Sequence, residues 1–365
     1  MSNFLNNLNV ALVGPIPPPA GGMANQTRKL RQFLQQENCT CQMVATNAPY
    51  RPAWAEKLPG VRAIFRLFPY LFALHRACKS ADIMHIMANS GWSWHLFAAP
   101  AILIARWNKV PVMVNYRGGY AEAFFQQSWF WVNKTLSKAQ GVIVPSPFLQ
   151  DVFAKWQVDA GVVPNVLDTQ LFCFQPKSKI SDTPHIMVAR NLEEIYDVPT
   201  AIHAFAIILQ QFPDAQLSIA GSGPELDKLQ QLTQQLGLTE KVTFTGRLTV
   251  EEMAKLYHSA DLSINPSVVD NTPNSVIESL ACGTPVVTTN VGGIPKLVSD
   301  QHDALLIDPA QPQIMADAAI KILSDNDLRQ RLIDNGQQTT EKFHWQNVKQ
   351  LLSQYYQAAI NGDGK

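Results

Sequence analysis

The sequence of 365 residues has few cysteines, and they are scattered. Cys39, Cys41, Cys78, Cys173 and Cys282 show neither the density of a disulfide framework nor the spacing of a zinc site. This pattern excludes a small disulfide-stabilised scaffold. It fits a reducing compartment, and we expect a cytoplasmic protein.

The sequence also lacks a long apolar segment. Its longest apolar run, HLFAAPAILIARW, is broken by Pro100 and closed by Arg106, so it is too short to span a bilayer. The first ten residues, MSNFLNNLNV, lack the basic region and apolar stretch of a signal peptide. We therefore expect a protein that is not integral to a membrane.

Charged residues are scarce, at 16%, whereas hydrophobic residues make up 46% of the chain. This composition and length allow more than one hydrophobic core, which predicts two domains. The formal net charge is zero, but residues 1–140 contain 14 Lys and Arg against 4 Asp and Glu, and the remainder contains 15 against 25. The basic excess predicts an anionic surface or ligand for the first part.

Short apolar runs alternate with helix-length segments along the whole chain. In the first part the runs lie at 9–14, 81–87, 110–116 and 141–146. In the second part they lie at 185–189, 216–221, 241–246, 260–267 and 284–289. This alternation predicts the α/β fold class, with two doubly wound, Rossmann-like parallel sheets facing a cleft.

Turn-forming residues accumulate over 162–184, where we expect the linker. The domains are therefore expected at 1–170 and 171–342. A last helix at 343–362 is expected to pack back across the first domain.

Three segments follow predicted strands in the way that ligand-binding loops do, because ligands of open α/β sheets bind beyond the carboxyl ends of strands. They are Gly21-Gly22, AGSGPE at 220–225, and Pro273-Asn274-Ser275. For AGSGPE a plain strand-to-helix turn is the alternative.

The third segment begins a helix that carries Glu278 about one turn along. Phosphate at the helix start and a sugar hydroxyl on the carboxylate would suit a nucleoside diphosphate. The alternative is a capping box over 275–278, in which Glu278 only satisfies its own helix.

Several longer motifs follow one another along the chain. The second part contains VAR (188–190), AGSGPE, FTGRLTVEEMAKLYHSADLSINPS (244–267) and DNTPNSVIESLACGTPVVTTNVGG (270–293). Outside it lie GPIPPPAGG (14–22), VVPNVLDTQLF (162–172) and FHWQNVKQLLSQYY (343–356). In this order the first set resembles the C-terminal half of the family 4 retaining glycosyltransferases of the GT-B fold, and the second set resembles the N-terminal loop, interdomain connection and final helix of that family. The resemblance implies that 1–170 binds the acceptor and 171–342 binds a nucleotide-sugar donor.

The resemblance also implies roles for single residues. Glu278 matches the acid that binds the ribose hydroxyls, Asp270 the acid that contacts the donor sugar, and Arg190 the arginine that neutralises the diphosphate leaving group. The backbone of Asn274, Ser275 and Val276 would hold the distal phosphate. Gly21 and Gly22 would close on the donor, and Gly246, Arg247 and Leu248 would lie at the base.

Three positions depart from the family pattern. Asp270 is one methylene shorter than the usual glutamate, and Tyr196 stands where a lysine is usual. Arg117, in VNYRGGY, stands where the family often has a histidine, and we expect it to supply charge to the donor or the acceptor. Arg117 therefore joins Arg190, Asp270 and Glu278 as a candidate catalytic residue.

The resemblance implies a retaining, metal-independent glycosyltransferase. It would move a sugar from a nucleoside-diphosphate sugar to a hydroxyl of a glycan or lipid-linked acceptor, in bacterial surface polysaccharide or lipopolysaccharide synthesis. We expect no cofactor, no metal and no nucleic-acid partner. The Asp325-Asn326-Asp327 sequence is interpreted as a helix cap and not as a metal-binding motif. The alternatives are a nucleotide-sugar epimerase of the same fold and a non-enzymatic subunit that binds sugar nucleotide.

The segment 50–79 has six basic residues, one acid and six aromatic residues. Val61, Ile64, Phe65, Phe68 and Phe72 fall on one helical face, a pattern that suits an anionic membrane interface. The alternative is an amphipathic helix that packs on its own sheet. The first interpretation predicts peripheral binding to the inner face of the cytoplasmic membrane.

Overall fold

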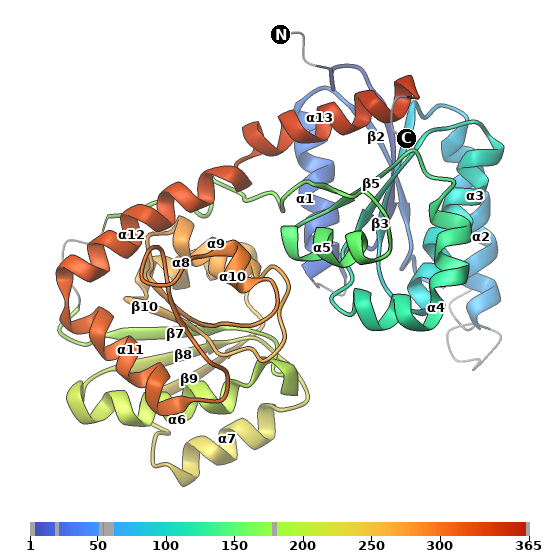
Figure 1. Ribbon diagram of the computed structural model, residues 1–365. Helices are drawn as coiled ribbons and strands as arrows, with labels where there is room; N and C mark the ends of the chain where they lie inside the picture. The colour runs from blue at the N-terminus through green and yellow to red at the C-terminus, as the bar shows by residue number, and fades with distance from the viewer. Residues whose placement is uncertain (1–3, 19–21, 51–53, 55–61, 177–180, 363–365) are drawn as a thin grey trace. The chain divides into compact units, whose positions relative to one another are not determined.

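The computed structural model describes residues 4–18, 22–50, 54, 62–176 and 181–362 (Figure 1). The chain divides into two compact units. Unit 1 comprises Met1–Val166 with Trp345–Lys365, and unit 2 comprises Leu167–His344. The boundaries predicted from the sequence, 170/171 and 342/343, lie within a few residues of these.

Unit 1 is built on one parallel sheet in the order β2-β1-β3-β4-β5-β6. The strands are β1 (Asn9–Gly14), β2 (Thr40–Ala45), β3 (Ile83–Ala88), β4 (Val112–Tyr116), β5 (Gly141–Val144) and β6 (Gly161–Val162). The helices are α1 (Gly22–Gln36), α2 (Arg62–Cys78), the π-helix η2 (Trp94–Ala98), α3 (Ala99–Trp107), α4 (Ala121–Leu136), α5 (Pro147–Lys155) and α13 (Trp345–Asn361).

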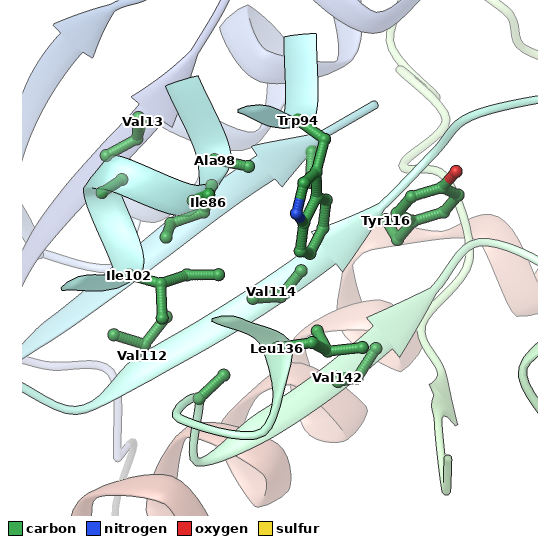
Figure 2. Close-up of a cluster of buried hydrophobic side chains, with 14 of the residues drawn as sticks. Val13, Ile86, Trp94, Ala98, Ile102, Val112, Val114, Tyr116, Leu136 and Val142 are labelled. Carbon is green, nitrogen blue, oxygen red and sulfur yellow. The ribbon is translucent and has the colours of Figure 1, made fainter. Parts of the chain in front are cut away.

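Both faces of this sheet are buried, because side chains alternate between them along each strand. On one face Val13, Ile86, Val114 and Tyr116 pack against α2 and the helices from η2 to α5, and Trp94 of η2 belongs to the same cluster (Figure 2). On the other face a separate group of strand residues packs against α1 and α13. That group includes Val10, Leu12, Ile83, Met113 and Ile143.

The final helix, α13, therefore belongs to unit 1 although it follows unit 2 in the sequence. Val348, Leu352 and Tyr356 form its buried side. At its start Trp345 Nε1 donates to Glu37 Oε1 at 2.8 Å, and Lys349 forms an ion pair with the same carboxylate at 3.1 Å.

Unit 2 contains a second parallel sheet, in the order β12-β11-β10-β7-β8-β9. The strands are β7 (His185–Ala189), β8 (Gln216–Ala220), β9 (Val242–Gly246), β10 (Leu262–Asn265), β11 (Val286–Thr289) and β12 (Leu305–Ile307). The helices are the 3-10 helix η3 (Glu194–Tyr196), α6 (Val198–Gln211), α7 (Leu226–Gln235), α8 (Val250–Ser259), α9 (Asn274–Ala281), α10 (Ile294–Leu297), α11 (Pro312–Ser324), α12 (Asn326–Thr340) and the 3-10 helix η4 (Glu341–Phe343).

The two sheets confirm the α/β fold class with two doubly wound domains. The runs at 9–14 and 185–189 coincide with β1 and β7. The sequence missed the edge strand β2, in which only Cys41 and Val44 are buried, and the very short strands β6 and β12. An edge strand needs no continuous apolar run, because its two faces are less completely buried than those of a central strand.

In each unit the first strand is flanked by later strands on both sides. β1 lies between β2 and β3, and β7 lies between β8 and β10. After each of these first strands the chain builds the sheet towards one edge, and it later returns to build the sheet towards the other edge. This reversal of direction opens a crevice at the carboxyl ends of β1 and β7. The topology thus marks the end of β1 and the end of β7 as the places for a ligand.

Among the described residues, no helix has the length and hydropathy needed to cross a membrane.

We expect Tyr356→Phe to destabilise unit 1. The Tyr356 hydroxyl lies 2.7 Å from Nδ1 of His85, which is completely buried, so the variant leaves an unsatisfied ring nitrogen. The expected loss is about 1–3 kcal/mol of unfolding free energy, measured by urea denaturation. Tyr355→Phe, at the next position on the partly exposed side of α13, is the control and should change little. Equal losses in both variants would show that the hydrogen bond contributes nothing specific.

Candidate functional site

The carboxyl ends of β7 and β10 meet at the switch point of unit 2. Arg190 follows β7 directly, and Asn265 is the last residue of β10. Arg190 Nε donates to Asn265 Oδ1 at 2.6 Å. The topology thus joins two residues that are 75 positions apart, as the crevice rule for open α/β sheets predicts.

Arg190 is fixed by three neighbours. Besides Asn265, its guanidinium forms an ion pair with the Asp270 carboxylate, and both side chains are only about 10% exposed. The central carbon of the guanidinium, Cζ, also lies 5.2 Å from the centre of the Tyr196 ring. Tyr196, which stands where a lysine was expected, therefore adds a cation–π contact to Arg190 and no second positive charge.

Asn265 is itself held by the neighbouring strand. Its Nδ2 donates to Thr288 Oγ1 of β11 at 2.8 Å, and Ser267 Oγ donates to its Oδ1 at 3.0 Å. All three side chains are buried. A buried amide whose oxygen and nitrogen are both hydrogen-bonded has one orientation, so Arg190 is anchored to the sheet itself. The sequence assigned no role to Asn265, although this residue lies in the matching segment 244–267, because an asparagine at a strand end does not by itself indicate a function.

The loop that carries Asp270 is pinned on its other side. Asp270 Oδ1 accepts from the backbone N–H of Asn271 at 2.9 Å, and its backbone oxygen accepts from Gly293 N–H at 3.0 Å. A Cβ atom at Gly292 would lie 2.0 Å from that backbone oxygen. The missing Cβ of Gly292 thus allows the loop to come close, and the bond from Gly293 N–H helps to hold the Asp270 carboxylate beside Arg190.

Helix α9 starts two residues earlier than a capping box over 275–278 would require, because that box needs Ser275 as the N-cap. Its N-cap is Pro273, which has no side-chain capping bond, and Ser275 lies inside the first turn. The capping-box interpretation of Glu278 is therefore wrong. The true capping box of this region is at α8, where Thr249 and Glu252 exchange both bonds.

The first turn of α9 presents polar groups that its own helix does not use. Backbone N–H groups at a helix start have no intrahelical partner, and they attract anions. Ser275 Oγ is buried and, within the described part of the chain, has no hydrogen-bond partner. Asn274, Ser275 and Val276, which the sequence assigned to a phosphate, therefore do form a helix start.

Glu278 lies further along α9 and is partly buried. Its charge, after burial itself, raises the pKa of Tyr257 on α8 well above the ordinary value, while the charge of Arg190 acts in the opposite direction. Tyr257 is thus a neutral, buried phenol that lies in the field of both candidate residues. The sequence assigned no role to Tyr257, although it lies in the matching segment 244–267, because a tyrosine on the buried face of a helix looks like an ordinary core residue.

The glycine segment 220–225 is a strand-to-helix turn whose glycines permit close backbone contact. A Cβ atom at Gly221, where φ is +152°, would lie 1.8 Å from the Arg190 backbone oxygen. At Gly223 it would lie 2.2 Å from the Leu192 oxygen. AGSGPE therefore forms a strand-to-helix turn, which was one of its two interpretations. The two glycines let this turn pack directly on the backbone at Arg190 and Leu192.

The predicted base loop follows β9, at the edge of the same sheet. Gly246 adopts a φ of +70°, and its oxygen accepts from Gly221 N–H at 2.9 Å. Arg247 is exposed and donates to Ser222 Oγ at 3.2 Å, and Leu248 is partly buried. Gly246, Arg247 and Leu248 thus lie beside the glycine turn and close to the end of β8.

In unit 1, Arg117 follows β4 and is held by two asparagines. Both of its terminal nitrogens donate to Asn165 Oδ1, at 2.8 and 2.6 Å, and Nε donates to Asn115 Oδ1 at 3.3 Å. Among the described residues it forms no ion pair with a carboxylate. Burial lowers its pKa to about 10, so it remains charged at neutral pH.

This chain of bonds continues into the core. Because Asn115 offers its oxygen to Arg117, its Nδ2 donates to His85 Nε2 at 3.1 Å, and His85 Nδ1 faces the Tyr356 hydroxyl. Burial, followed by the charge of Arg117, lowers the pKa of His85 to about 3. His85 is therefore a neutral structural histidine, and it helps to orient Arg117.

Two further predictions concern residues at the start of helices. Gly21 lies outside the described residues, and Gly22 is the exposed first residue of α1. Asp325 is the N-cap of α12, with Oδ1 accepting from Leu328 N–H at 2.9 Å, which confirms the helix-cap interpretation of this acidic sequence.

Two family models match consecutive parts of the chain. The model described as Glycosyltransferase Family 4 matches residues 20–171, and the one described as Glycosyl transferases group 1 matches residues 173–339. Among curated proteins, a D-inositol 3-phosphate glycosyltransferase of Corynebacterium urealyticum is 31% identical over 175 residues, which make up 46% of this chain and 41% of that protein. The chain spans about half the length, or less, of the relatives that it matches at this level.

Two solved structures share the fold over nearly the whole chain. Sucrose-phosphate synthase of Thermosynechococcus elongatus has a TM-score of 0.75 at 21% identity, covering 96% of this chain and 98% of that one. The Anabaena protein HepE, in complex with UDP and glucose, has a TM-score of 0.71 at 16% identity, covering 95% and 99%. The likeness to these structures establishes the GT-B type of two-domain α/β architecture.

We expect Gly221→Ala to damage the candidate site through the backbone. The added Cβ would overlap the Arg190 oxygen, so the unfolding free energy of unit 2 should fall by about 3 kcal/mol. The control is Gly246→Ala, where φ is also positive but nothing lies near the added atom, and the expected cost is about 1 kcal/mol. Chemical denaturation measures both, and equal costs would contradict the close contact.

Proposed function

The chain belongs to the group 1, family 4 glycosyltransferases, and from this premise we propose that it transfers a sugar, with retention, from a nucleoside-diphosphate sugar to a hydroxyl group. The observation that carries the proposal is the fixed Arg190–Asp270 pair at the switch point of unit 2, beside the start of α9. An anchored cation beside a helix start suits a diphosphate.

We propose that the donor binds at this end of unit 2. The first turn of α9, with the unpartnered Ser275 hydroxyl, would hold the distal phosphate, and Arg190 would neutralise the diphosphate. Glu278 would accept hydrogen bonds from the ribose hydroxyls, and Asp270 from the donor sugar. The loop Gly246–Leu248 would lie at the base. Support for the ligand class comes from HepE, a fold relative that was solved with UDP and glucose.

The proposed chemistry uses no protein nucleophile and no metal. The bond between the anomeric carbon and the diphosphate oxygen breaks, and the acceptor oxygen forms a bond to the same face of that carbon. The acceptor proton passes to the departing diphosphate. Arg190 and the α9 start stabilise the charge that develops on the leaving group, and they do so without reorganising, because Asn265 and Asp270 already hold the guanidinium.

We propose that Arg117 serves the acceptor in unit 1. It is a charged group that lies at a strand end and is bonded to amide oxygens alone among the described residues. A phosphate or carboxylate on the acceptor would complete its neutralisation. A glycan or lipid-linked acceptor of this kind occurs in bacterial surface polysaccharide synthesis, and it would place the protein in the cytoplasm at the inner face of the membrane.

Glu278→Gln should weaken donor binding by about tenfold, because a hydrogen bond to a charged acceptor is replaced by one to a neutral amide. A panel of nucleoside-diphosphate sugars in a thermal-shift assay first identifies the donor, and calorimetry then compares the affinities. Glu240→Gln, an exposed acid elsewhere in unit 2, is the matched control. Unchanged affinity in Glu278→Gln would remove the ribose assignment, and no shift with any donor would remove the transferase proposal.

Arg190→Lys should lower transfer or donor hydrolysis by about 100-fold, because lysine keeps the charge but cannot bond Asn265 and Asp270 together. The exposed Arg331→Lys is the control, and it should retain full activity. Donor binding without turnover in the unmodified protein would favour a non-enzymatic sugar-nucleotide-binding subunit. Interconversion of donor sugars would favour an epimerase.

A further inference from the structure

Helices α2, α3 and α4 lie side by side on one face of the unit 1 sheet (Figure 1). Each buries one side in the same hydrophobic core. Their opposite sides form a common surface, which we call the outer helix face. It carries large apolar side chains that are exposed, namely Phe68, Phe72, Leu103, Trp107, Phe130 and Trp131.

Helix α2 shows why these side chains need an explanation. It packs on its sheet through Tyr70, Leu74 and Ala77, and this contact leaves Phe68 and Phe72 on the far side, 70% and 69% exposed. Phe68 and Phe72, two of the aromatic residues noticed in the sequence, therefore do not hold the helix in place, whereas Phe65 is partly buried and Val61 lies outside the described residues. Single exposed apolar residues are ordinary, but six on three adjacent helices form a patch.

The same three helices are strongly basic. The segments 62–79, 99–109 and 121–138 contain 8 Lys and Arg against 1 Asp or Glu, and unit 1 as a whole contains 17 against 7. Arg76, Lys79, Arg106, Lys109, Lys134 and Lys138 are exposed. Lys134 Nζ lies 5.6 Å from the centre of the Trp131 ring, so a basic and an aromatic side chain of this face lie next to each other.

We propose that the outer helix face binds an anionic membrane surface. Aromatic rings are favoured at the depth of lipid headgroups, and lysine and arginine side chains around them reach the phosphates. A second copy of this chain is a poorer occupant, because a two-fold contact would bring the same basic side chains against each other. The inference extends the proposed lipid-linked acceptor to a membrane partner, but it rests on residues outside the candidate active site.

The test is flotation of the full chain with phosphatidylcholine vesicles, with and without phosphatidylglycerol. The protein should float with the anionic vesicles, and added salt should release it. The variant pair Phe72→Ser with Trp107→Ser, and the variant set Arg106→Gln, Lys134→Gln and Lys138→Gln, should each lower vesicle partitioning by about tenfold.

The controls match these changes elsewhere on the surface. Leu236→Ser with Ile314→Ser removes two exposed apolar residues of unit 2, and Lys255→Gln, Lys321→Gln and Arg331→Gln remove three exposed charges of the same unit. Both control variants should float like the unmodified protein. Thermal unfolding and nucleoside-diphosphate-sugar binding of every variant show that the fold and the candidate active site are intact.

Three results would overturn the proposal. They are no flotation of the unmodified protein with anionic vesicles, equal flotation with neutral vesicles, and unchanged flotation of the Phe72 and Trp107 variant. A dimer in analytical ultracentrifugation that this variant disperses would instead assign the face to a second copy. Failure of the proposed function would appear as absent donor binding or transfer, which are measured without vesicles, so the two failures are distinguishable.

Discussion

The candidate active site depends on one contact, the bond between Arg190 and Asn265 across the switch point of unit 2. β7 and β10 are neighbours in the sheet, so the residue after one strand meets the last residue of the other. Asn265 is fixed by β11 through Thr288, and Arg190 in turn fixes Asp270. A cation held in this way lies in position before any ligand arrives, which is the condition for electrostatic stabilisation of a leaving group.

Unit 1 uses a related arrangement at the end of its own sheet. A line of buried polar groups runs from Tyr356 of α13 through His85 and Asn115 to Arg117. The final helix thus contributes a hydroxyl to the support of an arginine that is more than two hundred residues away in sequence. By packing on this sheet, α13 therefore completes the core of unit 1 and also helps to orient Arg117.

The sequence predicted the strands well where both faces of the sheet are covered, since buried parallel strands read as apolar runs. It missed β2, β6 and β12, which are edge or very short strands. At Glu278 the spacing left a capping box over 275–278 open as the alternative interpretation, and the earlier helix start at Pro273 rules that alternative out. Asn265 and Tyr257 lie in the segment 244–267 that resembles the family, but only the fold brings them near Arg190.

The sequence by itself determined the fold class, the two domains and most of the residues that gather at the strand ends, because strand periodicity and glycine turns are local properties. It also contained the aromatic and basic residues of α2. Tertiary structure alone decided which face of that helix is buried, that Tyr196 stacks on Arg190, and that Asp270 pairs with the same guanidinium. These outcomes depend on which elements pack together, and packing is set by contacts between residues far apart in the chain.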